Sequence, residues 1–168
     1  MGSANGDERP SLVAPGLWLG IGLGGFVDGI VLHQLLQWHH LVSEVYPPDT
    51  LANTRINVTA DGFFHAFTWV AVAAGLALLW RAVRAGRPWT WRTLLGWILA
   101  GWGVFNLVEG IVDHHVLQIH RVRPDAGNPL AWDLGFLALG AALLVGGWFL
   151  ARRDRPRGDG RQPGRDRA

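Results

Sequence analysis

Two stretches of the sequence decide how the chain folds: DGIVLHQLLQWH at residues 28–39 and EGIVDHHVLQIH at residues 109–120. Aligned without gaps at an offset of 81 residues, they share Gly-Ile-Val after an acid, a histidine at the same place, a Leu-Gln pair and a final histidine. Both stretches end long apolar runs. Because acids and imidazoles are costly inside a membrane span and are usually functional there, their repetition at identical spacing predicts one shared site.

The composition limits which kinds of site are available. The chain has no cysteine, and its single methionine is Met1. Disulfides, zinc–thiolate sites, iron–sulfur clusters and thioether copper sites are therefore excluded. Any metal ion must be bound by imidazole and carboxylate groups.

Four segments are long and apolar enough to cross a bilayer, for which about 20 residues suffice. We predict an all-α integral membrane protein, a four-transmembrane-helix bundle in one domain over residues 12–151. A short flank at residues 1–11 precedes it, and residues 152–168, rich in Arg, Gly and Pro without apolar periodicity, form a disordered tail. The predicted spans are 12–40, 62–83, 93–119 and 131–151.

The arginines predict the orientation of the spans. All fifteen basic residues are arginine, and twelve lie in the flank, the tail and the connection between the second and third spans. The other two connections hold only Arg55, Arg121 and Arg123. By the positive-inside rule both termini are cytoplasmic, and every histidine falls in the outer half. The sequence pI near 10.3 comes from the tail, so nucleic acid is not expected as a partner.

The repeat predicts two duplicated helical hairpins with parallel orientation, formed by the first and second spans and by the third and fourth. A two-fold arrangement of such hairpins brings the acids and imidazoles towards each other. The second and fourth spans align less well, and placing Trp80 on Trp148 puts His65 opposite Asp133.

Straight α-helical geometry divides the repeated residues between two faces. At about 100° per residue, the acid and the last histidine of each stretch lie about 20° apart, whereas the first histidine lies about 140° from the acid. The rise from Asp28 to His39 is about 16 Å, too far for one metal ion to contact both. We therefore expect one stripe facing the bundle axis and another facing a neighbouring helix, or two sites at different depths.

The candidate ligands follow from the repeat and from depth in the membrane. Imidazole and carboxylate suit transition metals such as copper, iron or zinc, and facing histidines suit haem. Asp61 is interpreted as a helix N-cap, and His40 and His115 are weaker candidates because they break the repeat. The plain structural alternative is an acid–histidine network that only locks the bundle together. The candidate metal ligands are Asp28, His33, His39, His65, Glu109, Asp113, His114 and His120, and the candidate cofactor-binding pair is His33 and His114.

Three blocks of the chain resemble one known family. They are GFVDGIVLHQLLQWHH at 25–40, DGFFHAFTWVA at 61–71 and FNLVEGIVDHHVLQIHRVRP at 105–124. In this order they are similar to the domain of unknown function 2243 family of small bacterial four-span membrane proteins, over about residues 12–151. The resemblance implies a multi-pass protein of the bacterial inner membrane. It also implies copper or haem handling near a respiratory-chain membrane partner, because members are encoded near cytochrome oxidase assembly proteins.

The sequence leaves three functions open. The first is a membrane protein with a metal or haem site in the outer half of the bilayer. The second is a proton or ion relay. The inner halves of the second and fourth spans argue against a relay, because they contain no polar residue apart from Thr68. The third is a scaffold whose glycine-rich faces dock on another copy or on a membrane partner. The sequence contains no nucleophile arrangement, phosphate loop or dinucleotide motif, so no reaction is predicted.

Overall fold

The protein, described by a computed structural model over residues 11–86 and 89–153, is helical in all its regular structure within those ranges. Helix α1 (Val13–Val27) continues into a π-helical segment (Asp28–Leu35), and α3 (Trp91–Glu109) continues into another (Gly110–Val116). The other two helices are α2 (Leu51–Arg84) and α4 (Pro129–Arg153).

The four helical segments are each long and apolar enough to cross a membrane. The prediction of an all-helical protein with four spans is confirmed. The predicted flank up to residue 10 and the predicted tail from residue 154 onward lie outside the described residues.

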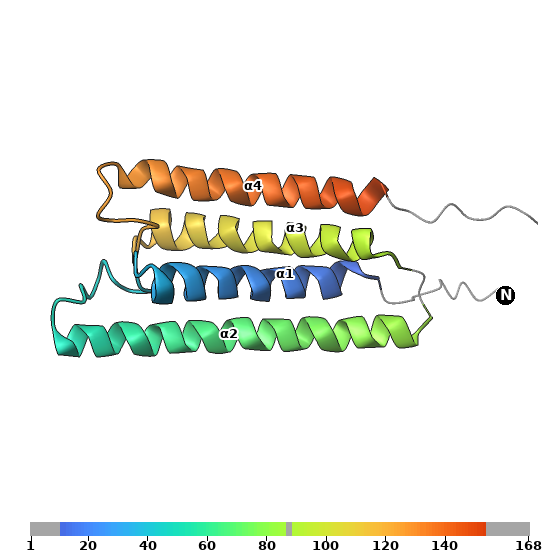
Figure 1. Ribbon diagram of the computed structural model, residues 1–168, viewed down its shortest axis with the longest axis horizontal. Helices are drawn as coiled ribbons and strands as arrows, with labels where there is room; N and C mark the ends of the chain where they lie inside the picture. The colour runs from blue at the N-terminus through green and yellow to red at the C-terminus, as the bar shows by residue number, and fades with distance from the viewer. Residues whose placement is uncertain (1–10, 87–88, 154–168) are drawn as a thin grey trace, which may run out of the picture.

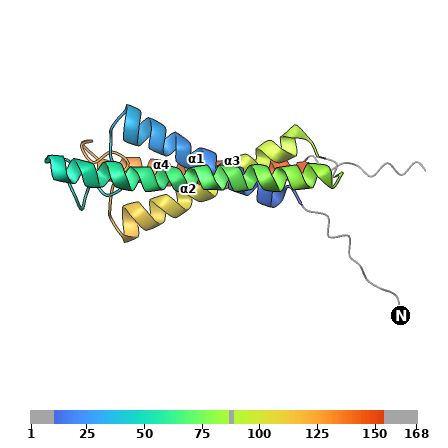
Figure 2. The same ribbon diagram turned by 90° about the horizontal axis from the view of Figure 1, so that it is seen from below.

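The helices lie in a row in which α1 and α3 form the central pair and α2 and α4 flank them (Figure 1). Helix α1 contacts α2 and α3, and α3 contacts α4, whereas α2 and α4 do not touch in the described part of the chain. Figure 2 shows that α1 and α3 cross at a clear angle. Because of this arrangement the central pair is much better shielded than the outer helices.

Glycine allows the central helices to approach closely. A Cβ atom on Gly20 would collide with the backbone of α3 at Ile98 and Gly101. Small residues at such crossings let two backbones pack directly, which drives helix association in lipid. The crossing of α1 and α3 therefore depends on glycine rather than on large apolar side chains.

Helix α2 begins earlier than predicted. Its N-cap is Thr50, whose hydroxyl accepts a hydrogen bond from the Asn53 N–H at 3.2 Å. The predicted span started only at residue 62 because the first turns are polar, and Asp61 was interpreted as its cap. That interpretation was wrong: Asp61 lies inside α2 and is buried.

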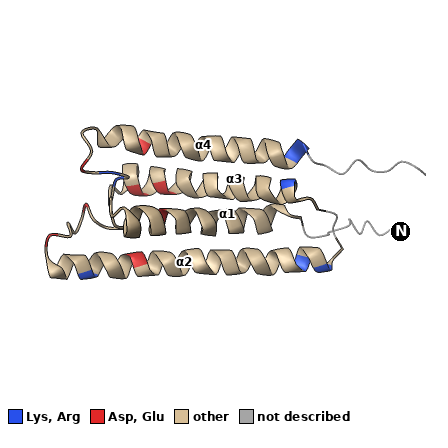
Figure 3. Ribbon diagram, in the orientation of Figure 1, with Lys and Arg blue, Asp and Glu red and all other residues tan. Residues whose placement is uncertain are grey.

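The charged residues are divided between the two ends of the molecule. The described acids lie towards the end that holds the α1–α2 and α3–α4 connections, and most described arginines lie at the other end (Figure 3). The acids include buried groups on all four helical segments. The acids are therefore concentrated at one end of the bundle.

Candidate metal centre

The four repeated histidines form one compact, buried cluster. The His33 and His39 rings lie 4.6 Å apart between centroids and cross edge to face, and the His114 and His120 rings do the same at 4.7 Å. The His39 and His120 rings stack at 4.7 Å, which joins the two pairs. None of the four side chains is more than 3% exposed.

The π-helical segments place each acid beside the first histidine of its stretch. Five residues separate Asp28 from His33, and a π-helix closes its hydrogen bonds over five residues, so both side chains share a face. The Asp28 Oδ2 atom lies 3.0 Å from His33 Nε2. The expectation that the two side chains point about 140° apart was wrong because it assumed an uninterrupted α-helix.

A chain reversal brings the last histidine back over the first. Gln37 adopts a left-handed backbone with φ 50°, a conformation common where helices end, and the Trp38 N–H bonds the Leu32 carbonyl at 2.9 Å. The chain therefore folds over its own last turn, and His39 returns to His33. The separation of about 16 Å that a straight helix would give was wrong for the same reason.

Gln118 has the same left-handed backbone, with φ 51°, at the end of the other π-helical segment. There the Ile119 N–H bonds the Asp113 carbonyl at 3.0 Å. His120 is thereby folded back to His114.

Hydrogen bonds at Nδ1 orient three of these rings. His39 Nδ1 donates to the Val122 carbonyl at 2.8 Å, and His120 Nδ1 donates to the Leu41 carbonyl at 3.1 Å. His33 Nδ1 donates to Asp61 Oδ1 at 2.9 Å. A carbonyl or carboxylate oxygen only accepts, so each of these Nδ1 atoms carries a proton. Nε2 of His39 and Nε2 of His120 then keep a lone pair, whereas His33 Nε2 faces a second carboxylate, Asp28 Oδ2, at 3.0 Å.

Burial keeps the two histidines beyond the spans neutral. Removal from water lowers the pKa of His39 to about 4, and burial with neighbouring imidazoles lowers the pKa of His120 well below its usual value. Neutral imidazole is the form that binds metal ions. These two rings are therefore ready to act as ligands at neutral pH.

Several buried polar atoms of the cluster have no hydrogen-bond partner. They are His39 Nε2, His114 Nδ1 and both carboxylate oxygens of Glu109. Buried polar groups are nearly always satisfied, and most of these atoms carry free lone pairs. Such a concentration of unpaired acceptors suits a cation.

The donor atoms fall into three overlapping groups, each with its atoms within 4.8 Å of one another. Glu109, His114 and His120 give two imidazoles and one carboxylate, a set typical of non-haem iron. Ligands at right angles on one ion, with bonds of about 2.1 Å, lie about 3.0 Å apart. His114 Nε2 and His120 Nε2 are 3.0 Å apart. The other two groups are His33, His39 and His120, and Asp28, His33 and Glu109.

Asp61 on α2 supports the cluster without belonging to these groups. Besides His33 Nδ1, its carboxylate accepts hydrogen bonds from His40 Nδ1 at 2.7 Å and from the Leu41 N–H at 2.9 Å. Carboxylates that hold a ligating histidine in this way fix its orientation and raise its basicity. Interpreting Asp61 as a cap missed this role, although its place in an apolar segment was the signal that could have found it.

Asp133 on α4 has the corresponding position on the other side. It accepts hydrogen bonds from Arg121 Nη1 at 2.9 Å and from the Val122 N–H at 3.0 Å. Its Oδ1 lies 3.6 Å from His114 Nδ1. These contacts resemble those of Asp61, which accepts the Leu41 N–H, whereas His65 bonds the backbone of its own helix.

Two of the candidate ligands lie outside the three groups. His65 Nδ1 donates to the Asp61 carbonyl of its own helix at 2.8 Å, and Asp113 is half-buried and belongs to none of the three groups. The weaker candidate His115 bonds the Gly110 carbonyl at 2.7 Å. The structure thus brings together the six residues that the repeat pairs, namely Asp28, His33, His39, Glu109, His114 and His120.

A polar cavity lies beside the cluster, at the end of the bundle that holds the α1–α2 connection. It has a volume of about 640 Å³, and its lining includes Gln34, Gln37, His39, His40 and Glu44. His39 thus lies both in the cluster and on the wall of this cavity.

Comparison with known proteins identifies a family and no characterised relative. Residues 15–154 match the family described as Predicted membrane protein (DUF2243). No curated protein and no solved structure matches the chain.

Proposed function

The chain belongs to this family of predicted membrane proteins, and from that premise we propose that it is a membrane metalloprotein. Its centre is formed by two carboxylates and four histidines: Asp28, His33, His39, Glu109, His114 and His120. The centre lies at the end of the bundle where the α1–α2 and α3–α4 connections meet.

One observation carries the proposal. Two buried imidazoles, His39 and His120, have their Nδ1 atoms held by backbone carbonyls, which directs their Nε2 lone pairs into the cluster. A network that served only to lock the bundle would satisfy its own polar atoms, yet the Glu109 carboxylate and His39 Nε2 are left without partners. A bound cation accounts for both features.

The donor set favours a metal ion over haem. Imidazole and carboxylate suit iron, manganese, zinc or copper(II). A haem held by two histidines needs a flat apolar slot between their rings. Here the His114 and His120 rings contact each other directly at 4.7 Å, and Glu109 Oε1 lies 3.5 Å from His120 Nε2.

The number of donors favours two ions. Glu109 belongs to two of the three groups, one with Asp28 and His33 and the other with His114 and His120. A carboxylate shared in this way bridges two ions, which in dinuclear sites lie about 3.5–4 Å apart. When bound, such a centre supplies Lewis-acid or redox chemistry.

We also propose that the bundle is an internal duplication of two hairpins. Its support is a set of matching contacts in which Leu41 corresponds to Val122 and His39 to His120 at the offset of 81 residues, while the two acceptor acids, Asp61 and Asp133, are 72 residues apart. The Leu41 N–H bonds Asp61 and the Val122 N–H bonds Asp133, at 2.9 and 3.0 Å. His39 bonds the Val122 carbonyl while its counterpart His120 bonds the Leu41 carbonyl, so the two halves exchange equivalent bonds.

The proposed orientation places the centre on the outer side of the bacterial inner membrane, with both termini cytoplasmic. Its support is the arginine distribution, since most of the described arginines lie at the end opposite the acids (Figure 3). The polar cavity then opens outward and admits ions from that side. This position suits metal handling for a respiratory-chain partner, as the resemblance implies.

A proton or ion relay is the weaker alternative. Within residues 11–86 and 89–153, the innermost buried polar side chains are Thr68 and Asn106. No chain of buried polar side chains continues from there along the described inner halves of the helices. A relay across the membrane would need one.

The proposal is tested by metal analysis of protein purified without chelators and then loaded separately with iron(II), manganese(II), zinc(II) and copper(II). We expect up to two ions per chain in the unaltered protein and strong loss in His120→Gln. The matched control is His65→Gln, which replaces a histidine outside the centre and should keep the full metal content. Failure of all four ions to bind stoichiometrically, or equal losses in both variants, would contradict the proposal.

A further inference from the structure

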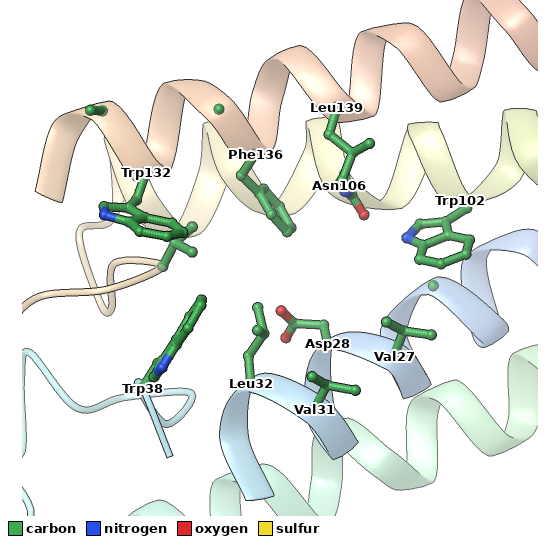
Figure 4. Close-up of a pocket in the computed structure, with 14 residues that line it drawn as sticks. Val27, Asp28, Val31, Leu32, Trp38, Trp102, Asn106, Trp132, Phe136 and Leu139 are labelled. Atoms are coloured by element: carbon green, nitrogen blue, oxygen red, sulfur yellow. The ribbon is translucent and has the colours of Figure 1, made fainter. Parts of the chain in front are cut away.

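A second cavity lies beside the metal cluster and faces the membrane. It has a volume of about 370 Å³ and is bounded by α1, α3, α4 and the segment after α1 (Figure 4). Helices α1 and α4 do not contact each other in the described chain, so the cavity opens between them. Its rim residues Val27, Trp132 and Leu139 are all exposed, in positions that lipid would cover.

Two buried polar groups point into this apolar cavity. Asp28 and Asn106 are only 4% and 2% exposed. Asn106 Oδ1 has no hydrogen-bond partner, and Asp28 Oδ2 contacts only His33 Nε2, at 3.0 Å, so the carboxylate can accept further hydrogen bonds. Figure 4 shows the Asp28 carboxylate and the Asn106 amide directed into the space. Unpaired acceptors in an apolar pocket are the groups that fix the orientation of a ligand with hydrogen-bond donors.

Aromatic rings form the walls around these acceptors. Trp38 and Trp132 meet edge to face with centroids 5.2 Å apart, and Phe136 and Trp102 line other sides. The Arg123 guanidinium lies over both indoles, 4.9 Å from Trp38 and 5.3 Å from Trp132. This cation–π stack holds the two indoles in place, and aromatic walls favour a flat ring as the ligand.

We propose that this cavity binds a lipid-soluble hydroquinone or related phenol that enters from the bilayer between α1 and α4. Its hydroxyl groups donate to Asp28 and Asn106, its ring packs among the aromatic side chains, and its apolar tail extends into lipid. The volume is that of a small-ligand pocket. No residue that lines the cavity carries a cationic side chain, so an anionic head such as a fatty-acid carboxylate would meet Asp28 without compensation.

A cationic amphiphile fits less well than a hydroquinone. A quaternary ammonium group has no hydrogen to donate, so it would leave Asn106 Oδ1 unpaired. A hydroquinone has two hydroxyl groups for two acceptors. Asp28 also belongs to one of the metal-ligand groups, so the bound ring would lie directly beside the proposed centre.

The experiment compares three proteins of the full chain in lipid nanodiscs. Gly135 lines the cavity, and a Cβ atom added there meets nothing within 4 Å, so Gly135→Leu fills the space without a backbone clash. Gly146 on the same helix is also exposed with an open Cβ direction but lies away from the cavity, so Gly146→Leu is the matched control. Thermal unfolding and metal content are measured on all three to confirm that fold and centre are intact.

The probes are a decyl-substituted hydroquinone kept reduced under anaerobic conditions, its dimethyl ether, and decyltrimethylammonium. Binding is followed by quenching of tryptophan fluorescence. We expect saturable hydroquinone binding by the unaltered protein, at least about tenfold tighter than that of the ether, because the ether lacks the donors. Gly135→Leu should weaken hydroquinone binding at least about tenfold, and Gly146→Leu should leave it within about twofold.

Equal binding of hydroquinone and ether, unchanged binding in Gly135→Leu, or tighter binding of decyltrimethylammonium would each overturn the inference. The titrations are run on both chelator-treated and metal-loaded protein. Hydroquinone binding that follows the expected pattern in protein that takes up none of the four metal ions on loading would support this cavity while contradicting the proposed metal centre. Stoichiometric metal binding without saturable hydroquinone binding would support the metal centre and contradict the proposed role of this cavity.

Discussion

Replacing Asp61 with asparagine should weaken metal binding although Asp61 is not among the proposed ligands. The carboxylate is 1% exposed and accepts hydrogen bonds from His33 Nδ1 at 2.9 Å, from His40 Nδ1 at 2.7 Å and from the Leu41 N–H. Asparagine has nearly the same shape but carries no charge and keeps only one acceptor oxygen. Asp61→Asn therefore weakens the hold on His33 without removing a ligand.

The size of the effect follows from these contacts. Loss of a carboxylate that holds a metal-binding histidine costs about 10–100-fold in affinity, which is about 1.4–2.7 kcal/mol. Hydrogen bonds to charged groups contribute about 1.5–3 kcal/mol each, against about 1 kcal/mol for neutral ones. With three such bonds weakened or lost, the free energy of unfolding of the metal-free protein should fall by about 2–4 kcal/mol.

The assay is competition for zinc(II) with a coloured chelator, with thermal unfolding measured on the same samples. Asp49→Asn is the control, because Asp49 is exposed just before α2 and its Oδ1 accepts only a 3.3 Å bond from Asn53. That variant should change stability by less than about 0.5 kcal/mol and leave zinc affinity unaltered. If Asp61→Asn binds zinc as tightly as the unaltered protein, His33 is not oriented by Asp61 as a ligand, and the reasoning is refuted.

Three further predictions concern pH, helix crossing and backbone strain. The pKa of His39 is lowered to about 4 in the folded protein, whereas an imidazole in the unfolded chain has a pKa of about 6.5. As pH falls below about 6.5, His39 is therefore protonated in the unfolded chain before it is protonated in the folded protein. The free energy of unfolding of the metal-free protein should then drop by about 3 kcal/mol between pH 6.5 and pH 4, and denaturant unfolding at a series of pH values that showed no such slope would contradict this. Gly20→Leu, which drives a side chain into the α3 backbone, should lower the melting temperature strongly while Gly146→Leu does not, and equal melting temperatures would refute the close α1–α3 crossing. Gln37→Gly should raise stability by up to about 1 kcal/mol, since Gln37 holds φ 50°, whereas a loss of stability in thermal unfolding would count against the left-handed turn.

The sequence predicted that the chain has four spans and which acids and histidines lie close together. The four apolar runs correspond to the four helical segments, since the cost of burying polar backbone in lipid leaves few other arrangements. The repeated acids and histidines pointed to one cluster, and the structure gathers the six residues that the repeat pairs.

The local geometry could not be predicted because it departs from a regular helix. Nothing in the spacing of Asp28, His33 and His39 shows that the segment is π-helical and then reverses at Gln37. A π-helix closes each hydrogen bond over five residues where an α-helix closes it over four. This difference of one residue places His33 Nε2 3.0 Å from Asp28 Oδ2, whereas in an α-helix His33 would lie on the far side. Asp61 was missed for a related reason, since the polar first turns of α2 hid the true start of the helix.

X-ray absorption spectroscopy of the metal-loaded protein in lipid tests the central claim most directly. The account predicts a shell of nitrogen and oxygen ligands at about 2.0–2.2 Å with outer-shell scattering from several imidazoles. If two ions are bound, it also predicts a metal–metal distance of about 3.5–4 Å. A shell of oxygen ligands without imidazole scattering would place the metal outside the histidine cluster and contradict the account.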